Sequence, residues 1–556
     1  MTDKTHARAM REAVWCAVAV AVVITLAVVT YDAWNRRTQP IFAVRPHPML
    51  PAAMQEFIRP GYGEYSAVVP RDKALLAWTS FALRHLGGDY AALMRAQLAL
   101  LGLVIALAAV AAWPGGRTAA ALAAGAFVAF SPLTAELALA FDDHLFNAAG
   151  VFATLALLAW SNGARRWPVM LAAGLAAGAT LRGAFIPSNG LIALATVAFG
   201  ALGLGIEHVA RERKAIAHAV ATRHAESTRD LIARPALGAL AMLAGFALVA
   251  ASIWASGRIQ PGYYAGEWSR AFLPDELIPY TPGAVWAYPW LVFHEQLGPV
   301  GTAWAIAGLV AALVFRPRGM GLWLGAALAP FALVVAIAKK NPYYDVYAVL
   351  AMTTLGGIGL AAIPRRAVRA ALIVVFALAG AAFTGHRLFF GRSIEGTPLV
   401  MYHFQEQPGF WLNTPRTEPW REDDAATRIA AAIRSIRPSG DVLVLVVDET
   451  VVIERVERLR YFLATRDARL TMLVTQTAQA LPWRDDAPFV LHVRVGDAAA
   501  PSPRELLAKG ADHHRDPRSA FADAGGLEYL DELARRADAM TTLAEGDFWV
   551  LDGFAP

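Results

Sequence analysis

The feature that most constrains this chain is a succession of apolar runs that begins near residue 13 and continues to about residue 386. An α-helix needs roughly 20 apolar residues to cross the hydrocarbon core of a bilayer, with a range of about 17–25. About eleven runs approach or reach that length. They are centred on residues 13–30, 94–113, 118–138, 145–160, 167–185, 188–206, 236–255, 299–315, 320–338, 346–363 and 368–386. The sequence therefore predicts a mainly α-helical polytopic membrane protein.

Composition supports this class. The 556 residues are 56% hydrophobic and 17% charged, whereas a soluble protein is typically about 45–50% apolar and about 25% charged. The net charge is only +5, and most basic residues stand in short links between apolar runs, so we expect no nucleic-acid partner. The single cysteine, Cys16, lies inside the first run, which excludes an intrachain disulfide. That run is long enough to span and lacks a small-residue cleavage site, so we expect a retained helix rather than a signal peptide.

Basic residues predict the orientation of the spans, because Lys and Arg accumulate in cytoplasmic loops. With a cytoplasmic N-terminus, the cytoplasmic links hold Arg117, Arg165, Arg166, the basic segment 207–235, Arg316, Arg318, Arg365, Arg366 and Arg369. The short links 139–144 and 186–187 on the other side contain no Lys or Arg. This orientation predicts five segments on the outer face: the long first loop (31–93), FDDH (141–144), the aromatic-rich segment 256–298, KKNPYY (339–344) and everything after about residue 387.

The composition changes beyond residue 390 to that of a globular domain. The segments DVLVLVV (441–447), RLTMLVT (469–475), FVLHVRV (489–495) and FWVLD (548–552) have the pattern of strands. Helical patterns at 449–466 and 526–542 alternate with them. We therefore predict a transmembrane domain over residues 1–389 and an extracytoplasmic α/β domain over residues 390–556.

The basic segment 207–235 alternates apolar with basic positions. This pattern is typical of an amphipathic helix that lies on the anionic inner leaflet. It is equally typical of a solvated loop that only sets topology. The sequence leaves both alternatives open.

Two adjacent carboxylates, Asp142 and Asp143, stand in the short outer link FDDH. Ionised groups this close to hydrocarbon are costly and usually face a cavity or a partner. Carboxylate oxygens suit Mg²⁺ or Mn²⁺, which would neutralise a phosphate leaving group. The alternative is a helix cap, since an Asp at the start of a helix satisfies free N–H groups. One Asp suffices for a cap, so the second favours a divalent-cation site.

An acid follows the first apolar run directly, in TYDAWNRRTQ (30–39). The two arginines of this stretch depart from the positive-inside pattern, and they would meet a lipid phosphate or pair with Asp32. The alternative is an interfacial belt of Tyr31 and Trp34 beside a solvated Asp32. Taken alone, the stretch favours the belt.

Further cations stand on the predicted outer face. They are Lys73, Arg182, Lys339 and Lys340, and Tyr343 and Tyr344 follow the last two. Binding of a phosphate group explains cations at these positions. The alternatives are snorkelling side chains and an aromatic belt.

These features together resemble the GT-C superfamily of membrane glycosyltransferases, including aminoarabinose transferases, protein mannosyltransferases and oligosaccharyltransferase catalytic subunits. The segment PRDKALLAWTSFALRHLGGDYAALMRAQLAL (70–100) is similar to the "EKPPLLYWL" region of aminoarabinose transferases, with Lys73 on the family lysine. YDAWNRRTQ resembles the "DPWFNYRAT" stretch of oligosaccharyltransferases, with Asp32 on the acid. FDDHLFNAA resembles their second-loop acidic motif, with His144 at the third acidic position.

The resemblance implies an enzyme that moves a sugar from a polyprenyl-phosphate-linked donor to a hydroxyl of a glycan, lipid or protein acceptor. It implies Asp32 as the general base, with Glu64 as its competitor, and a possible divalent cation (Mg²⁺ or Mn²⁺) at Asp142 and Asp143. It also implies that Lys73 and Tyr343 or Tyr344 contact the donor phosphate, and we assign Arg182, Lys339 and Lys340 the same role. The expected location is a bacterial inner membrane, with the C-terminal domain in the periplasm.

Two other functions stay open. An oligosaccharyltransferase or glycan ligase with a polyprenyl-pyrophosphate donor would share the acid after the first span. A non-catalytic lipid or solute carrier would typically show paired repeats and helices broken near the midplane of the membrane. The sequence shows neither feature, which favours the transferase.

Overall fold

The computed structural model describes residues 3–37, 90–139, 144–161, 166–183, 187–222, 229–255, 291–336, 345–390, 421–436, 442–448, 470–474, 490–495, 540–546 and 549–554, with a few isolated positions. Contacts divide the chain into two compact units. The first consists of Met1–Arg36 and Gln97–Pro415, and the second of Arg37–Ala96 and Arg416–Pro556.

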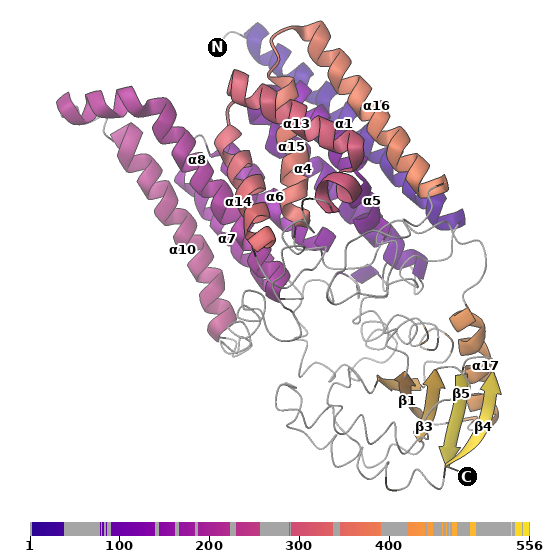
Figure 1. Ribbon diagram of the computed structural model, residues 1–556. Coiled ribbons are helices and arrows are strands. Elements are labelled where there is room, and N and C mark those ends of the chain that lie inside the picture. The colour runs from indigo at the N-terminus through magenta and orange to yellow at the C-terminus, as the bar shows by residue number, and fades with distance from the viewer. Residues whose placement is uncertain are drawn as a thin grey trace. The chain divides into compact units, whose positions relative to one another are not determined.

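The first unit is a bundle of helices (Figure 1). The α-helices are α1 (Asp3–Arg37), α4 (Tyr90–Ala129), α5 (Pro132–Leu139), α6 (His144–Trp160), α7 (Trp167–Gly183), α8 (Pro187–Thr222), α10 (Arg234–Ala255), α13 (Gly298–Phe315), α14 (Met320–Ala336), α15 (Val346–Ala361) and α16 (Arg366–Phe390). Two short π-helical turns, η3 (Arg229–Ala233) and η4 (Leu291–Gln296), precede α10 and α13.

Six helices within the described residues are long and apolar enough to cross a membrane. They are Met10–Ala33, Arg95–Ala129, Gly190–Arg213, Leu231–Ser252, Gly298–Phe315 and Arg366–His386. Shorter apolar helices cover His144–Trp160, Trp167–Leu181, Met320–Ala336 and Val346–Ala361. These helices coincide with the predicted apolar runs, because a continuous apolar segment satisfies its backbone polar groups most simply as a helix. The count of eleven spans stays a prediction.

The runs 94–113 and 118–138 deviate from the prediction at two places. They share α4, which is interrupted at Gly116 and Arg117, where Arg117 has a left-handed φ of 53°. The second run also breaks before its predicted end, at Ser131, and α5 begins at Pro132. Ser131 Oγ accepts a hydrogen bond from the Thr134 N–H (3.1 Å). Since a Ser before a Pro is a favoured helix start, the local sequence explains this break.

Helices pack closely where glycines face one another. A Cβ on Gly308 of α13 would collide with the backbone of Gly356 on α15, and one on Gly174 of α7 would collide with the Met242 carbonyl of α10. Small residues bring helix backbones together in this way in membrane proteins. In Figure 1 the pair α7 and α10 runs side by side along its length.

The buried Trp304 of α13 anchors an aromatic cluster in this bundle. Its ring stacks on Phe127 with centroids 3.6 Å apart, and Phe376 packs edge-on against it. Its indole N–H donates to the Thr353 carbonyl at 3.0 Å. The indole is therefore buried without leaving its N–H unsatisfied, as buried Trp residues usually require.

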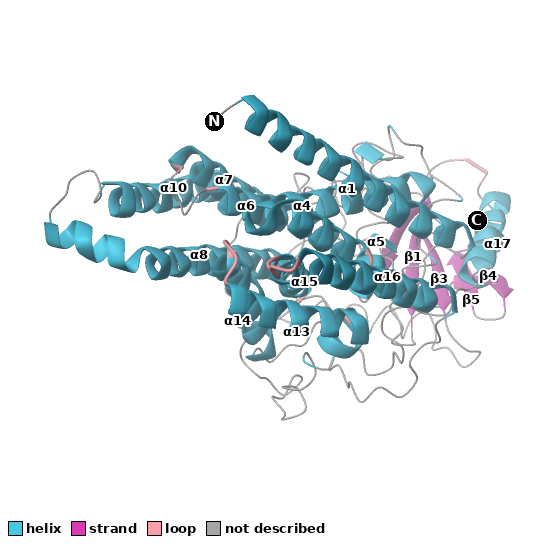
Figure 2. Ribbon diagram, turned by 90° about the horizontal axis from the view of Figure 1, so that it is seen from above, coloured by secondary structure: helices cyan, strands magenta, loops and turns pink. Residues whose placement is uncertain are grey.

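The second unit contains a five-stranded sheet and the helix α17 (Arg421–Ile436), both visible in Figure 2. The strand order is β2-β1-β3-β5-β4. The strands are β1 (Val442–Asp448), β2 (Leu470–Val474), β3 (Val490–Val495), β4 (Met540–Gly546) and β5 (Trp549–Phe554). β1 pairs in parallel with β2 and β3, whereas β5 pairs antiparallel with β3 and β4.

Four of these strands lie where the sequence patterns predicted strands, and β4 does not. β4 begins at Met540, inside the segment 526–542 that we predicted as helical. Its partner β5 follows after two residues, and the two strands form a hairpin with a register shift between Thr542 and Ala544. Pairing with β5 therefore overrides the local helical preference, because strand formation depends on tertiary partners more than helix formation does.

Candidate functional site

One end of the bundle, which we call the Asp345 end, gathers buried polar side chains from several helices. It comprises the last turns of α1, the α4–α5 break, the start of α6, η4, the start of α15 and the last turns of α16. Tyr31 Oη donates to the Ala129 carbonyl at 2.6 Å, and Thr384 Oγ1 donates to the Phe130 carbonyl at 2.5 Å. Because these carbonyls end a helix, they have no intrahelical partner, and the two hydroxyls satisfy them.

Asp345 lies at the centre of this end and has no exposed surface. Its Oδ1 accepts a hydrogen bond of 2.8 Å from Nε2 of Gln296, which is also buried. Its Oδ2 accepts no hydrogen bond from the part of the chain that the structure describes. Although Asp345 is the residue before α15, its carboxyl does not cap that helix. The usual reason for an Asp at this position is therefore missing.

Burial raises the pKa of the Asp345 carboxyl to about 8, although Gln296, the residue's own backbone and His144 act in the opposite direction. The cause is desolvation, which disfavours the charged form of an acid. An ionised carboxylate with so few donors would be costly to bury. The neutral acid explains why a single side-chain donor suffices.

His144 and Asn147 are the buried polar residues at the start of α6, with exposures of 4% and 1%. They stand three residues apart, so they share one face of the helix. His144 acts electrostatically on Asp345. His144 is the last residue of FDDH and Asp345 follows KKNPYY, so this electrostatic effect links two motifs that are far apart in the sequence.

Asp32 lies one residue after Tyr31 in α1 and is partly buried. We predicted that the first loop starts at residue 31, but α1 continues to Arg37. Asp32 is therefore held on a helix rather than on a loop. Its neighbour Tyr31 is fully buried at the Asp345 end, which places the Asp32 backbone at that end as well.

Most of the other predicted site residues lie outside the described residues. They are Glu64, Lys73, Asp142, Asp143, Lys339, Lys340, Tyr343 and Tyr344. Arg182 belongs to α7, but its side chain is not among those described. These assignments stay predictions.

The divalent-cation site also stays a prediction. Among the described residues, no group of three or more His, Cys, Asp or Glu side chains is arranged to hold a metal ion. The predicted ligands Asp142 and Asp143 are outside that set. A cation at these two residues therefore stays a prediction for a chemical test.

The sequence analysis assigned no role to Gln296 or Asp345, which are joined by a buried hydrogen bond. Asp345 stood inside the motif KKNPYYDVY without a predicted role, and Gln296 carried no signal. Buried polar residues beside apolar runs are candidates for function, so Asp345 was detectable in principle. Gln296 was not, because its importance depends on a partner 49 residues away.

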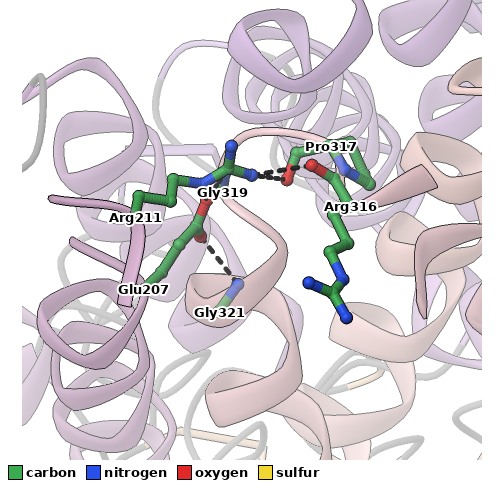
Figure 3. A network of polar contacts seen from close by, with 6 residues as sticks. All are labelled: Glu207, Arg211, Arg316, Pro317, Gly319 and Gly321. Atoms are coloured by element: carbon green, nitrogen blue, oxygen red, sulfur yellow. Dashed lines mark hydrogen bonds and ion pairs between the residues drawn. The ribbon is translucent and has the colours of Figure 1, made fainter. Parts of the chain in front are cut away.

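The opposite end of the bundle, which we call the Glu207 end, has a different arrangement (Figure 3). Glu207 of α8 accepts hydrogen bonds from the N–H groups of Gly319 (3.0 Å) and Gly321 (2.8 Å) at the start of α14. Arg211 pairs with Glu207 at 2.8 Å and donates to the carbonyls of Arg316 and Pro317 at the end of α13. The pair closes the α13–α14 turn by satisfying backbone groups that both helices leave free.

Two further arginines that we predicted to be cytoplasmic make contacts at this end. Arg117 lies 3.8 Å from Glu12 of α1, and Arg369 donates to the Ala361 carbonyl. The basic segment begins here as well, because α8 continues as a helix to Thr222. The first half of the basic segment is therefore helical, as the amphipathic-helix alternative required and the loop alternative did not. Its proposed contact with a lipid leaflet stays a prediction.

Comparison with known proteins identifies the fold. No protein-family model matches the chain, and no curated protein matches it by sequence. Among solved structures, ArnT from Cupriavidus metallidurans in the apo state is similar, with a TM-score of 0.56 and 14% identity. The match covers 97% of this chain and 99% of that chain. The same protein bound to undecaprenyl phosphate gives a TM-score of 0.55 over the same shares.

The chain therefore shares its fold with ArnT over nearly its whole length, as the resemblance inferred from the sequence predicted. The oligosaccharyltransferase of Archaeoglobus fulgidus matches at a TM-score of 0.40, with 12% identity and 64% of that chain covered.

Proposed function

We propose that this protein is a GT-C glycosyltransferase that moves a sugar from a polyprenyl-phosphate-linked donor to an acceptor hydroxyl. The observation that carries the proposal is the ArnT fold over 97% of the chain. One of the matching ArnT structures is bound to undecaprenyl phosphate, which is the lipid that such a reaction would release. We place the transfer reaction at the Asp345 end, because buried polar groups cluster there.

The proposed orientation puts the Asp345 end at the periplasmic face of a bacterial inner membrane. Arginines at the Glu207 end support this, since Lys and Arg accumulate in cytoplasmic loops. Arg117, Arg211, Arg316 and Arg369 make their contacts there. In this orientation the second unit, with its sheet, is periplasmic.

In the proposed reaction the acceptor oxygen attacks the anomeric carbon of the sugar. The bond between that carbon and the donor phosphate breaks, and polyprenyl phosphate leaves with the bonding electrons. Asp32 takes the proton of the acceptor hydroxyl as general base, and Glu64 is its competitor for this role.

Positive charge at the leaving phosphate would lower the barrier further. The residues proposed to supply it, or to donate hydrogen bonds, are Lys73, Arg182, Lys339, Lys340, Tyr343 and Tyr344. Their support is the resemblance to GT-C enzymes and the position of the last two directly before Asp345.

The defining experiment uses the purified chain in lipid nanodiscs with a polyprenyl-phosphate-linked sugar, and mass spectrometry follows both lipids. Release of polyprenyl phosphate together with a glycosylated acceptor is the expected result. Turnover only of a pyrophosphate-linked donor would establish the oligosaccharyltransferase alternative. Uptake of a solute or lipid without bond cleavage would establish the carrier and overturn the proposal.

Chelation tests the divalent cation in the same assay. If Asp142 and Asp143 hold Mg²⁺ or Mn²⁺, EDTA stops turnover, and addition of excess Mg²⁺ or Mn²⁺ restores it. Undiminished turnover in EDTA would remove the metal from the proposal and leave the cationic residues as the phosphate ligands.

A further inference from the structure

Three links between helices at the Glu207 end pack against one another. They are the interruption of α4 at 115–117, the α13–α14 turn at 316–319 and the α15–α16 connection at 362–365. A Cβ on Gly115 would lie 3.1 Å from the Arg318 carbonyl oxygen. A Cβ on Gly116 would lie 3.0 Å from the Cβ of Ala361, the last residue of α15. The two glycines therefore bring the three links together.

Each of these links carries exposed arginines, which we call the arginine face. They are Arg117, Arg316, Arg318, Arg365 and Arg366. Arg117 lies 3.8 Å from Glu12. The guanidinium groups of the other four make no hydrogen bond or ion pair with the residues that the structure describes. In Figure 3 the Arg316 side chain points away from Arg211.

The acids beside these links are engaged with other groups. Glu12 accepts a hydrogen bond from Thr118 Oγ1 at 3.1 Å. Glu207 receives two backbone N–H groups at the start of α14 and pairs with Arg211. Neither acid is therefore available to neutralise the four arginines. Like charges gathered on adjoining links repel one another, and a bound anion offsets this cost.

The three links also lie at a similar depth in the bundle. Phe127 of α4 stacks on Trp304 of α13, and Phe376 of α16 packs edge-on against the same ring. Between this aromatic cluster and the neighbouring link, each helix is about 14 to 17 Å long, from a rise of about 1.5 Å per residue. Half the hydrocarbon core of a bilayer measures about 15 Å. The arginines of all three links therefore emerge at one level.

Exposed apolar side chains adjoin the arginine face on two helices. Val314 and Phe315 of α13 directly precede Arg316, and Val368 of α16 follows Arg366 closely. A phospholipid has the same order of groups, with apolar acyl chains below a charged phosphate. Arginines that only set topology need a place along the chain, and they do not need to be packed together. Their assembly therefore favours a ligand.

We propose that the arginine face binds the phosphate of an anionic phospholipid in the adjoining leaflet, with the acyl chains against the exposed apolar side chains of α13 and α16. Arginine suits this ligand, because its planar guanidinium donates paired hydrogen bonds to phosphate oxygens. Basic clusters between the ends of membrane helices bind such headgroups. The inference does not depend on sugar transfer, because the lipid is bound at the end opposite to the proposed reaction.

The test compares two double variants of the full-length chain in detergent. Arg318→Gln/Arg366→Gln removes two arginines of the arginine face, and the control Arg166→Gln/Arg213→Gln removes two exposed arginines of the same end from outside the three links. Native mass spectrometry follows a titration with phosphatidylglycerol. We expect affinity to fall about 10- to 30-fold in the first variant, since each basic residue near a membrane surface contributes about fivefold. The control should stay within about threefold of wild type, because distant charges are screened.

Further arms identify the ligand. Phosphatidylcholine with the same acyl chains should bind wild type at least about tenfold more weakly, because its headgroup has no net charge. Millimolar inorganic phosphate should not displace phosphatidylglycerol, since it lacks the acyl chains. Arg318→Lys/Arg366→Lys should bind more weakly than wild type and more tightly than the Gln variant, because Lys keeps the charge and loses the paired geometry. Thermal unfolding without added lipid checks that each variant is folded.

The proposal is overturned by unchanged affinity in Arg318→Gln/Arg366→Gln, by an equal loss in Arg166→Gln/Arg213→Gln, or by equal binding of phosphatidylcholine. Displacement by inorganic phosphate would show a simple anion site and overturn the assignment to a lipid. If the Gln variant does not fold, the Lys variant and the salt dependence of wild type decide the question. Wild-type affinity that does not fall as ionic strength rises would then overturn the proposal.

Discussion

The two ends of the helix bundle surround a largely buried acidic side chain in opposite ways. Glu207 receives hydrogen bonds at both oxygens, from two backbone N–H groups and from Arg211. Asp345 has one side-chain donor, from Gln296, and its Oδ2 receives no hydrogen bond from the described residues. A carboxylate with a full set of donors holds a turn together, whereas one with an incomplete set indicates a site whose demands are not purely structural.

The groups that Glu207 and Asp345 contact also differ. At the Glu207 end the network joins a side chain to backbone groups within one turn between α13 and α14. At the Asp345 end the hydrogen bond joins two side chains from separate segments, Gln296 of η4 and Asp345 before α15. A side chain can be replaced without disturbing the backbone of a helix end. The side-chain contact at the Asp345 end therefore suits a functional site, whereas the backbone contacts at the Glu207 end suit a turn that only holds two helices together.

The largest effect is expected at Asp32. Asp32→Asn removes the proposed base and should lower kcat by about 100- to 10,000-fold, the range of general acid–base catalysis. The variant should fold normally, because Asp32 is only partly buried and Asn has nearly the same shape. Transfer assays and thermal unfolding on the same preparation measure both quantities. Full activity in Asp32→Asn, together with loss in Glu64→Gln, would move the base to Glu64.

The pH dependence of stability tests the buried Asp345 carboxyl. The folded pKa of Asp345 is raised from 3.8 to about 8, so the folded state binds this proton more tightly than the unfolded state. The contribution of the protonated Asp345 carboxyl to the free energy of unfolding is complete below about pH 4. It is lost as the pH rises through about 8. Asp345→Asn should remove this decline, and thermal unfolding across that range measures it. An unchanged pH profile in Asp345→Asn would show that the acid is ionised throughout.

Glu207→Ala tests the opposite end. It leaves the N–H groups of Gly319 and Gly321 and the Arg211 guanidinium without their partner. The expected loss of stability is about 2 kcal/mol, typical for uncovering buried polar groups. Glu207→Gln, which keeps one acceptor oxygen, should lose less. A thermal shift in Glu207→Ala no larger than that of an exposed substitution would mean that the α13–α14 turn does not depend on this clamp.

The smallest effect is expected at the α4–α5 break. Ser131→Ala removes the hydroxyl that caps α5 and should cost about 1 kcal/mol, the usual value for a helix cap. Ser131→Asp is the matched variant, since Asp also caps helices, and it should recover most of this loss. If both variants unfold like wild type, the break is set by Pro132 alone.

Much of the helical architecture could be predicted from the sequence. The apolar runs give the helix positions within a few residues, because the requirement for a span is local. The strands β1, β2, β3 and β5 were predicted by the same kind of local pattern. β4 was not, because its pairing with β5 decides its conformation. The extension of α1 through Asp32 was also missed, since polar residues beyond an apolar run do not by themselves end a helix.

The candidate site was only partly predictable. The motifs FDDH and KKNPYYDVY were identified, and the distribution of Lys and Arg predicts that they share one face of the membrane. The contact between Gln296 and Asp345 could not be predicted, because the two residues come from different helix ends.

By itself the sequence determined that this chain is a polytopic helical protein, which segments are apolar enough to cross the membrane and where along the chain its arginines gather, because each of these depends on the properties of contiguous residues. Only the tertiary structure decided that Asp345 accepts from Gln296 instead of capping α15, and that Glu207 closes the turn between α13 and α14. The physical reason is that both outcomes depend on how helices pack, and that packing is set by close contacts such as Gly308 against Gly356, which pair residues distant in the chain.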